Sequence, residues 1–215
     1  MAELLITGVW ETIYMTVVST VVAYVLGIPL GVILYITDKN GVRPNRAINL
    51  LVGTIVNIFR SVPFLILLVF IMPFTRFVVG TTIGSTATIV PLVVAAAPYV
   101  ARMVESSLKE VDAGVVEAAR AMGSSVWQMI VKVFLPEAKP SLMVGAAISL
   151  ATILGYSAMA GFVGGGGLGA IATNYGYYRY QTDIMFITVI LLVIIVQIFQ
   201  EGGLALARKF DKRLR

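Results

Sequence analysis

The chain has 215 residues, of which 59% are hydrophobic and only 13% are charged. Soluble domains usually carry about 25% charged residues, so this composition indicates an integral membrane protein. The chain contains no Cys and no His, which excludes thiol chemistry, most zinc sites and catalysis by Ser-His or Cys-His pairs. The net charge of +5 does not indicate nucleic-acid binding, because the basic residues lie between apolar runs and are not interleaved with aromatic ones.

Apolar runs set the number of membrane crossings. A hydrocarbon core about 30 Å thick takes about 20 helical residues to cross. Five runs reach or approach this length: 13–36, 48–74, 83–101, 142–162 and 184–199, the last extended by "GGLALA" after Glu201. The sequence therefore predicts an all-α integral membrane protein with five transmembrane helices, organised as one transmembrane domain over residues 1–215.

The basic residues divide unevenly between the two sides that five crossings define. Thirteen of the sixteen fall on one side: Lys39, Arg43, Arg46, Arg102, Lys109, Arg120, Lys132, Lys139, Arg208, Lys209, Lys212, Arg213 and Arg215. The positive-inside rule makes this side cytoplasmic, so we expect an external N-terminus and a cytoplasmic C-terminus. The first run does not read as a cleaved signal peptide, because it is too long and follows Glu3 and Glu11 in place of a basic start.

The cytoplasmic segment 112–139 is polar, yet it keeps a helical period of apolar residues. The third helix is expected to continue beyond its apolar run, with Glu105 and Lys109 four residues apart in the favourable order. Asp112 can then cap a short helix, in which Glu117 lies near the positively polarised N-terminus. The apolar side of this helix is expected to consist of Val115, Ala118, Ala119 and Met122.

A second short helix is expected after an elbow at Gly123, where glycine permits a left-handed stop. Ser125 and Gln128 match a capping box. Apolar residues then recur at helical spacing: Val126, Met129, Ile130, Val133 and Phe134. Pro136 is expected to end this helix, and Pro140 suits the first turn of the fourth span. The helix pair could pack on its own bundle at the membrane surface or dock a cytosolic partner.

The stretch "EAARAMGSSVWQMIVKVFLP" resembles the EAA loop of permease subunits of bacterial ATP-binding-cassette importers. The positions of that signature are filled by Glu117, Ala118, Ala119, Gly123, Val133, Leu135 and Pro136. In that family the loop forms coupling helices that enter a groove of an ATPase subunit, so the resemblance implies this role for the seven residues. "NIFRSVPFLILLVFIMPFTRFVVGTTIG", "PYVARMVESSL" and "GYSAMAGFVGGGGLG" resemble methionine-import permeases; polar amino-acid permeases are expected to have "FRGTP" in place of "FRSVP".

This resemblance implies a permease of the bacterial inner membrane that imports methionine, in its D- or L-form, by ATP-driven alternating access. The implied partners are a second copy of the chain, two cytosolic ATPase subunits, an external methionine-binding protein and the lipid bilayer, with no nucleic acid. The sequence lacks G-x-x-x-x-G-K-[ST], so ATP and Mg are expected on the ATPase subunits, and this chain is expected to hold no cofactor, metal or catalytic residue. "GGGGLG" favours a helix break or close helix packing over a phosphate loop.

Two other kinds of transporter stay open at this point. A permease for another small amino acid or a methionine derivative would share the same architecture. A stand-alone secondary carrier or channel is less favoured, because the five predicted spans contain no carboxylate for a proton relay and the docking segment would have no role.

Three residues within the expected spans are candidates for functional roles. Arg60 either pairs with an acid of the cytoplasmic loop, snorkels to the cytoplasmic face or contacts the substrate. Tyr156 and Met159 are large residues among small ones, and they stand three apart on one helical face. We expect both to face the axis of a two-fold dimer and contact the thioether chain of the substrate; the alternative is that they fill space between helices.

Overall fold

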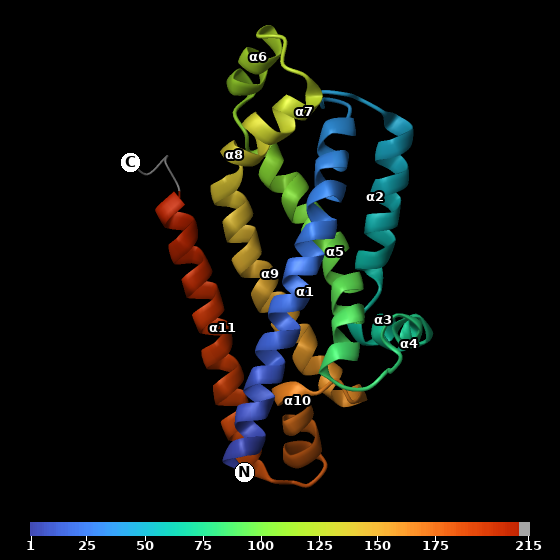
Figure 1. The fold of residues 1–215 in the computed structure, drawn as a ribbon, viewed down its shortest axis with the longest axis vertical. Helices are drawn as coiled ribbons and strands as arrows, with labels where there is room; N and C mark the ends of the chain where they lie inside the picture. The colour runs from blue at the N-terminus through green and yellow to red at the C-terminus, as the bar shows by residue number, and fades with distance from the viewer. Residues whose placement is uncertain (211–215) are drawn as a thin grey trace.

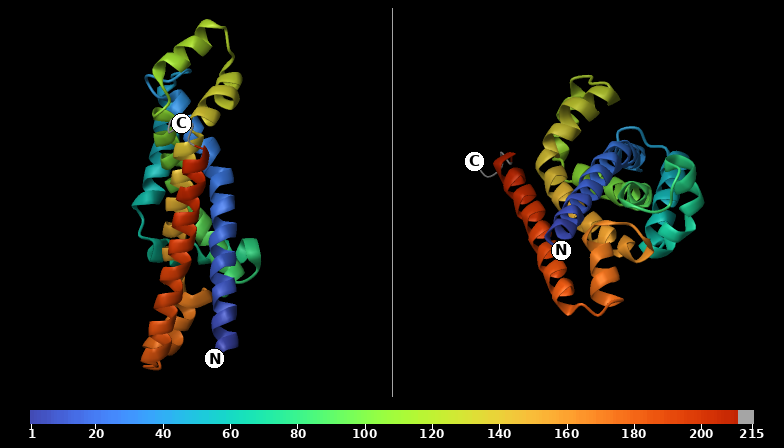
Figure 2. Two further views of the ribbon diagram at one scale, coloured as in Figure 1. Left: turned by 90° about the vertical axis from the view of Figure 1, so that its left-hand side faces the viewer. Right: turned by 60° about the horizontal axis from the view of Figure 1, so that its bottom comes forward.

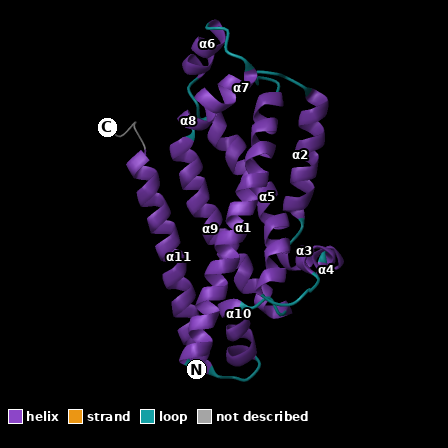
Figure 3. Ribbon diagram, viewed as in Figure 1, coloured by secondary structure: helices purple, strands orange, loops and turns teal. Residues whose placement is uncertain are grey.

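The computed structural model describes residues 1–210 and is built of helices joined by short loops (Figure 1, Figure 3). The helices are α1 (Ala2–Thr37), α2 (Arg46–Ser61), α3 (Phe64–Phe70), α4 (Met72–Val79), α5 (Ser85–Lys109), α6 (Ala113–Ala121), α7 (Val126–Met129), α8 (Leu135–Glu137), α9 (Lys139–Ala160), α10 (Gly167–Ile171) and α11 (Thr182–Phe210). Two π-helical turns, η1 (Ile130–Phe134) and η3 (Ala172–Tyr177), and one 3-10 turn, η2 (Gly161–Val163), continue or join them. The part of the chain that the structure describes is therefore an all-helical membrane protein, as predicted.

Four helical stretches of residues 1–210 are long and apolar enough to cross a membrane, and the bent pair α2–α3 makes a fifth if it counts as one span. The observed helices extend beyond the apolar runs. α1 begins well before residue 13, α5 continues to Lys109, and α11 continues through "GGLALA" to Phe210. The extensions of α5 and α11 are those that the sequence predicted, whereas the early start of α1 was not predicted.

The centre of the bundle is the pair α1 and α5, which run beside each other for most of their length (Figure 1). A Cβ on Gly31 of α1 would lie 2.5 Å from the carbonyl oxygen of Ala101, so only glycine permits this approach. α9 packs on both helices, and α11 runs along α9 on the outside of the bundle (Figure 2). The largest buried cluster lies at this centre and includes Leu92, Val100 and Val104.

The expected second span, 48–74, is not one helix. α2 ends at Ser61, and the chain bends by 102° before α3, which begins at Phe64. Val62 is extended, with φ −83° and ψ 125°, because the ring of Pro63 disfavours helical geometry in the residue before it. α3 and α4 therefore lie across the direction of α2 (Figure 1).

The basic segments gather at one end of the bundle, which we call the basic end. It comprises the loop 38–45, the segment 110–138 and the C-terminal part of α11 (Figure 1). The N-terminus, α10 and the glycine segment 161–167 lie at the opposite end, which we call the glycine end. Lys212, Arg213 and Arg215 of the predicted basic tail lie outside the described residues. The fold thus brings together the segments that the charge count grouped on one side.

Pro136 lies at the end of the helix that precedes it, as expected to within one residue. α7, η1 and α8 follow one another as far as Glu137, and Ala138 forms a turn with φ −78° and ψ −4° before α9 begins at Lys139. A proline inside an α-helix removes one hydrogen bond and clashes with the carbonyl four residues earlier. The π-helical turn η1, directly before Pro136, widens the helix where that clash would arise.

Candidate functional site

The segment 110–138 begins with the predicted capped helix. The carboxylate of Asp112 accepts hydrogen bonds from the backbone N–H groups of Gly114 (2.8 Å) and Val115 (3.3 Å), which starts α6. Glu117 lies in the second turn with its side chain exposed. Asp112 therefore performs the capping that its position predicted.

The predicted elbow is also present. Gly123 has φ +74°, and its N–H donates to the carbonyl oxygen of Arg120 at 2.9 Å. Ser125 and Gln128 then form a reciprocal capping box: the Gln128 N–H donates to Ser125 Oγ (3.3 Å), and the Ser125 N–H donates to Gln128 Oε1 (2.8 Å). Two short helices therefore meet at a glycine, and each has its own N-terminal cap.

One side of this segment belongs to the core of the bundle. Ala119, Met129 and Phe134 are buried, and Val133 and Leu135 pack against the same cluster. The ring of Phe134 meets Tyr35 of α1 edge-on, with centroids 5.0 Å apart. The segment is thus anchored on the bundle through its second helix and η1.

The other side of the segment exposes large apolar side chains. Met122 is 78% exposed, Trp127 72% and Val115 40%. The expected apolar side of the first helix is therefore only partly correct, because Ala119 is buried while Val115, Ala118 and Met122 are exposed. Trp127 was not identified from the sequence as an exposed residue. Its position outside the apolar stripe of a surface helix could have predicted this exposure. Pro136 is exposed as well.

A polar hollow of about 500 Å³ separates α6 from the end of α1. Its lining includes two acids and two bases: Asp38, Lys109, Glu117 and Arg120. Arg120 Nη2 also donates to the carbonyl oxygen of Gly41 at 3.1 Å, across the hollow's edge. Glu117 and Ala118 thus face open space beside the bundle, where another chain can reach them.

Tyr156 and Met159 both lie on α9 but have different surroundings. The ring of Tyr156 stacks on Phe64 of α3, with centroids 4.7 Å apart and planes 8° apart. Met159 is 45% exposed and lines an apolar groove of about 290 Å³ together with Tyr177 and Met185. Within one copy of the chain, the two side chains therefore do not share a pocket.

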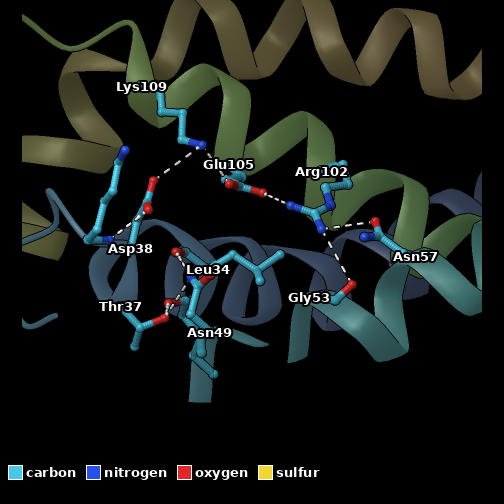
Figure 4. Close-up of polar contacts among 11 residues, drawn as sticks. Leu34, Thr37, Asp38, Asn49, Gly53, Asn57, Arg102, Glu105 and Lys109 are labelled. Atoms are coloured by element: carbon cyan, nitrogen blue, oxygen red, sulfur yellow. Dashed lines mark hydrogen bonds and ion pairs between the residues drawn. The ribbon is translucent and has the colours of Figure 1, made fainter. Parts of the chain in front are cut away.

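Arg60 lies in the last turn of α2 with its side chain exposed, and it makes no ion pair with any of residues 1–210. The expected pairing with an acid of the loop is therefore wrong for this chain taken alone. Arg102 forms an ion pair instead, with Glu105 of the same helix α5 (Figure 4). The sequence indicated that Glu105 lies on the water-exposed surface of a helix, but Glu105 is only 7% exposed.

The glycine segment is a helix break, as predicted. Gly164, Gly166 and Gly167 all have positive φ, which turns the chain from η2 into α10. The N–H of Gly167 donates to Glu11 Oε2 (2.7 Å), and that of Leu168 donates to Thr12 Oγ1 (2.9 Å). Because α1 already occupies these donors, the segment does not offer them to a phosphate. No group of three potential metal ligands occurs among the described residues.

The fold agrees with the comparisons of this chain to known proteins. Residues 27–215 match the family of binding-protein-dependent transport system inner membrane components. The chain belongs to this family. It is accordingly the multi-pass inner membrane permease of a transport system in which a separate subunit hydrolyses ATP.

Individual relatives are similar over nearly the whole chain. The probable D-methionine transport system permease protein MetI of Vibrio cholerae is 52% identical over 99% of this chain and 94% of its own. The methionine import system permease protein MetP of Bacillus subtilis is 46% identical over 95% of this chain and 92% of its own. A structure of the inward-facing MetNI methionine ABC transporter is 50% identical, with a TM-score of 0.97 over 99% of this chain and 98% of that one. An amino acid ABC transporter structure at 20% identity shares the fold, with a TM-score of 0.79 over 97% of this chain and 94% of that one.

Proposed function

We propose that this chain is the membrane subunit of an ATP-binding-cassette importer for methionine. It works as a two-fold dimer, with two cytosolic ATPase subunits that bind ATP and Mg and an external methionine-binding protein that delivers the substrate. The observation that carries the proposal is the continuous similarity to methionine permeases at about half identity over nearly all of the chain. Five crossings are few to enclose a pathway, which supports placing it on the dimer axis.

The basic end faces the cytoplasm in this proposal, and the N-terminus lies outside. Thirteen of sixteen basic residues support that orientation through the positive-inside rule. The ATPase subunit would then meet α6 and α7. The exposed side chains of Glu117, Met122 and Trp127 give this contact both charge and apolar area.

Coupling residues divide into two groups in this mechanism. Glu117 and Ala118 are exposed and would enter the groove of the ATPase, where small Ala side chains allow close approach. Ala119, Val133 and Leu135 pack on the bundle, so they transmit movement of the segment rather than contact the partner. Gly123 forms the elbow between α6 and α7, and Pro136 follows the π-helical turn η1 at the end of the segment. ATP binding closes the ATPase pair, moves the segment and switches the pathway from inward-open to outward-open.

We propose further that Tyr156 and Met159 contact the methionine side chain in transit, and that the whole chain 1–215 acts as one permease domain. The exposed groove beside Met159 supports this for a dimer, because a second copy could complete the wall. Contact of a thioether with an aromatic ring contributes about 0.3–1.5 kcal/mol. Such weak contact suits a site that must release its substrate. Arg60 has no ion-pair partner among residues 1–210, which leaves its guanidinium free for the dimer partner or the pathway.

Uptake by the purified complex tests this function. Proteoliposomes that hold the permease, its ATPase and the binding protein should take up labelled methionine only when ATP is supplied to the ATPase side. Unlabelled D- and L-methionine, methionine derivatives and other small amino acids serve as competitors. Uptake without ATP would indicate a secondary carrier, and displacement by another amino acid but not by methionine would overturn the substrate assignment.

Two substitutions test the pathway within the same assay. Met159→Arg should block uptake because it places a charge on the route, and Tyr156→Ala should lower the rate or relax selectivity while the complex still assembles. Ile148→Ala, at an exposed position of the same helix, is the control. Normal uptake by Met159→Arg would leave only the packing role for both residues.

A further inference from the structure

A buried carboxylate lies near the end of α5, at the basic end of the bundle. The side chain of Glu105 is 10% exposed, and each of its oxygens meets a different cation (Figure 4). Oε2 accepts from Arg102 Nη1 at 2.6 Å, and Oε1 accepts from Lys109 Nζ at 2.7 Å. A buried charge is tolerated only when its partners are this complete.

The two cations reach different helices. Arg102 Nη2 donates to Asn57 Oδ1 at 2.9 Å and lies 3.4 Å from the carbonyl oxygen of Gly53, both in α2. Lys109 Nζ lies 3.6 Å from Asp38 Oδ2, at the residue that follows α1. Glu105 therefore joins α5 to α2 on one side and to the end of α1 on the other.

The cluster also adjoins the segment 110–138, which is called the coupling segment below because of the role proposed for it. Lys109 is the last residue of α5, and Asp112 caps α6 only three residues later. On the other side of the hollow, Arg120 of α6 holds the loop after α1 through Gly41. α6 is thus connected to α1 both through Lys109 and through Arg120.

In the other direction, the cluster leads toward the proposed substrate site. Asn57 stands one turn before the end of α2 at Ser61, and Phe64, the first residue of α3 after the bend, stacks on Tyr156. A displacement of α2 therefore changes the position of the α3 ring against α9.

We propose that Glu105, with Arg102, Lys109 and Asp38, forms a positioning cluster that makes α1 and α2 follow the coupling segment when the ATPase moves it. Stability alone does not account for these charges, because apolar residues of similar volume usually stabilise a buried site as well or better. Charged hydrogen bonds instead fix one helix register and direction, since they require specific distances and angles. The inference rests on the proposed function, because it assigns a role within ATP-driven transport.

The test compares transport with ATP hydrolysis in the reconstituted complex. Glu105→Gln removes the charge and puts an N–H donor against one of its two cations. We expect the methionine moved per ATP hydrolysed to fall at least threefold, with complex recovery and ATP hydrolysis close to those of the unsubstituted complex. Glu110→Gln is the matched control: it removes the same charge five residues later at an exposed position without an ion pair among residues 1–210, and its ratio should not change.

Asn57 offers a second pair of variants, which keeps the proposal testable if Glu105→Gln fails to assemble. Asn57→Leu removes the acceptor for Arg102 at similar volume and should lower the ratio, whereas Asn57→Asp keeps an acceptor and should preserve it. An unchanged ratio in Asn57→Leu, or equal losses in Asn57→Leu and Asn57→Asp, would overturn the positioning role. The proposed function fails separately, if the unsubstituted complex shows no ATP-dependent methionine uptake.

Discussion

The two ends of α1 are held by opposite kinds of chemistry. At the glycine end, Glu11 and Thr12 accept hydrogen bonds from the backbone N–H groups of Gly167 and Leu168. At the basic end, the residue that follows α1 is Asp38, and it meets the side chain of Lys109 within a chain of charged groups. The contacts of α1 at the glycine end depend on the position of the backbone, and its contacts at the basic end depend on which charged side chains are present.

The difference determines what each end tolerates. Backbone donors exist at every residue, so the glycine end depends on steric fit, and any added side chain disturbs it. Charged side chains reach across several ångströms, so the basic end depends on sign and ionic strength. An end that must move with a partner is better served by the second arrangement, because side chains can reorient while the helices stay intact.

Labelling of single cysteines from one side of the membrane should give the largest difference between the two ends, because each cysteine either reacts or does not. We expect a cysteine at Gln128, at the basic end, to resist an impermeant reagent applied to intact cells, and a cysteine at Gln181, near the glycine end, to react. The native chain has no cysteine, and both positions are exposed. Labelling of residue 128 from outside would reverse the assignment of the two ends.

A methyl group at Gly167 should cost the most stability. Gly167 has φ +69°, and its Cβ would lie 2.6 Å from Thr12 Oγ1, whereas Gly80 has φ +82° with open space around it. Gly80→Ala should therefore lower the free energy of unfolding by about 1–2 kcal/mol, from backbone strain alone. Gly167→Ala adds overpacking and should cost about 2–5 kcal/mol in total.

Thermal unfolding in detergent measures this difference. Equal losses for the two glycines would mean that the glycine end is not sterically limited.

Gly123 separates strain from coupling. Its φ is +74° and nothing lies within 4 Å of its Cβ position, so Gly123→Val and Gly80→Val impose the same kind of backbone strain, the first within the segment 110–138 and the second directly after α4. We expect Gly123→Val to lower transport about tenfold, because a β-branched residue disfavours the elbow, and Gly80→Val to leave transport nearly unchanged. Glu117→Lys should weaken ATPase binding or uncouple hydrolysis through reversed charge.

Membrane insertion serves as the control for both coupling variants. Normal transport in Gly123→Val and Glu117→Lys together would show that the segment does not couple.

Salt should produce the smallest effect. Lys109 Nζ lies 3.6 Å from Asp38 Oδ2, and the two side chains are 49% and 35% exposed, so Asp38→Asn should cost less than about 1 kcal/mol of stability. That cost should vanish near 1 M salt, where the Debye length is about 3 Å. Unfolding of both proteins across a salt series measures it. A cost that persists at high salt would point to hydrogen bonding rather than charge.

Local signals predicted the segment 110–138 better than its surroundings. The caps at Asp112 and Ser125 and the turn at Gly123 depend on neighbours within a few residues, so their sequence was sufficient. Pro63 also acts locally, and the rule for the residue before proline could have predicted the break. Pro136 located the helix end to within one residue, because α8 ends at Glu137 and a turn at Ala138 follows.

Burial of charges could not be predicted, because it depends on distant helices. Glu105 and Lys109 read as an ordinary surface pair, and only the packing of α1 and α2 against α5 buries Glu105. The acidic partner of Arg102 is three residues away on α5, whereas its contacts with Gly53 and Asn57 are supplied by α2. Tyr156 and Met159 share a helical face in the sequence, yet their neighbours are supplied by α3 and by η3 with α11.

The length of α9 has a mechanical consequence. Lys139, where α9 begins, and Tyr156 are 17 residues apart, which is about 25 Å of helix at 1.5 Å per residue. A rigid helix of that length, pivoting by about 10° at the basic end, moves Tyr156 through about 4 Å, most of the pitch of one helical turn. A small tilt of α9 at one surface is thereby enough to displace a side chain far along the helix by several ångströms, without any helix having to unwind.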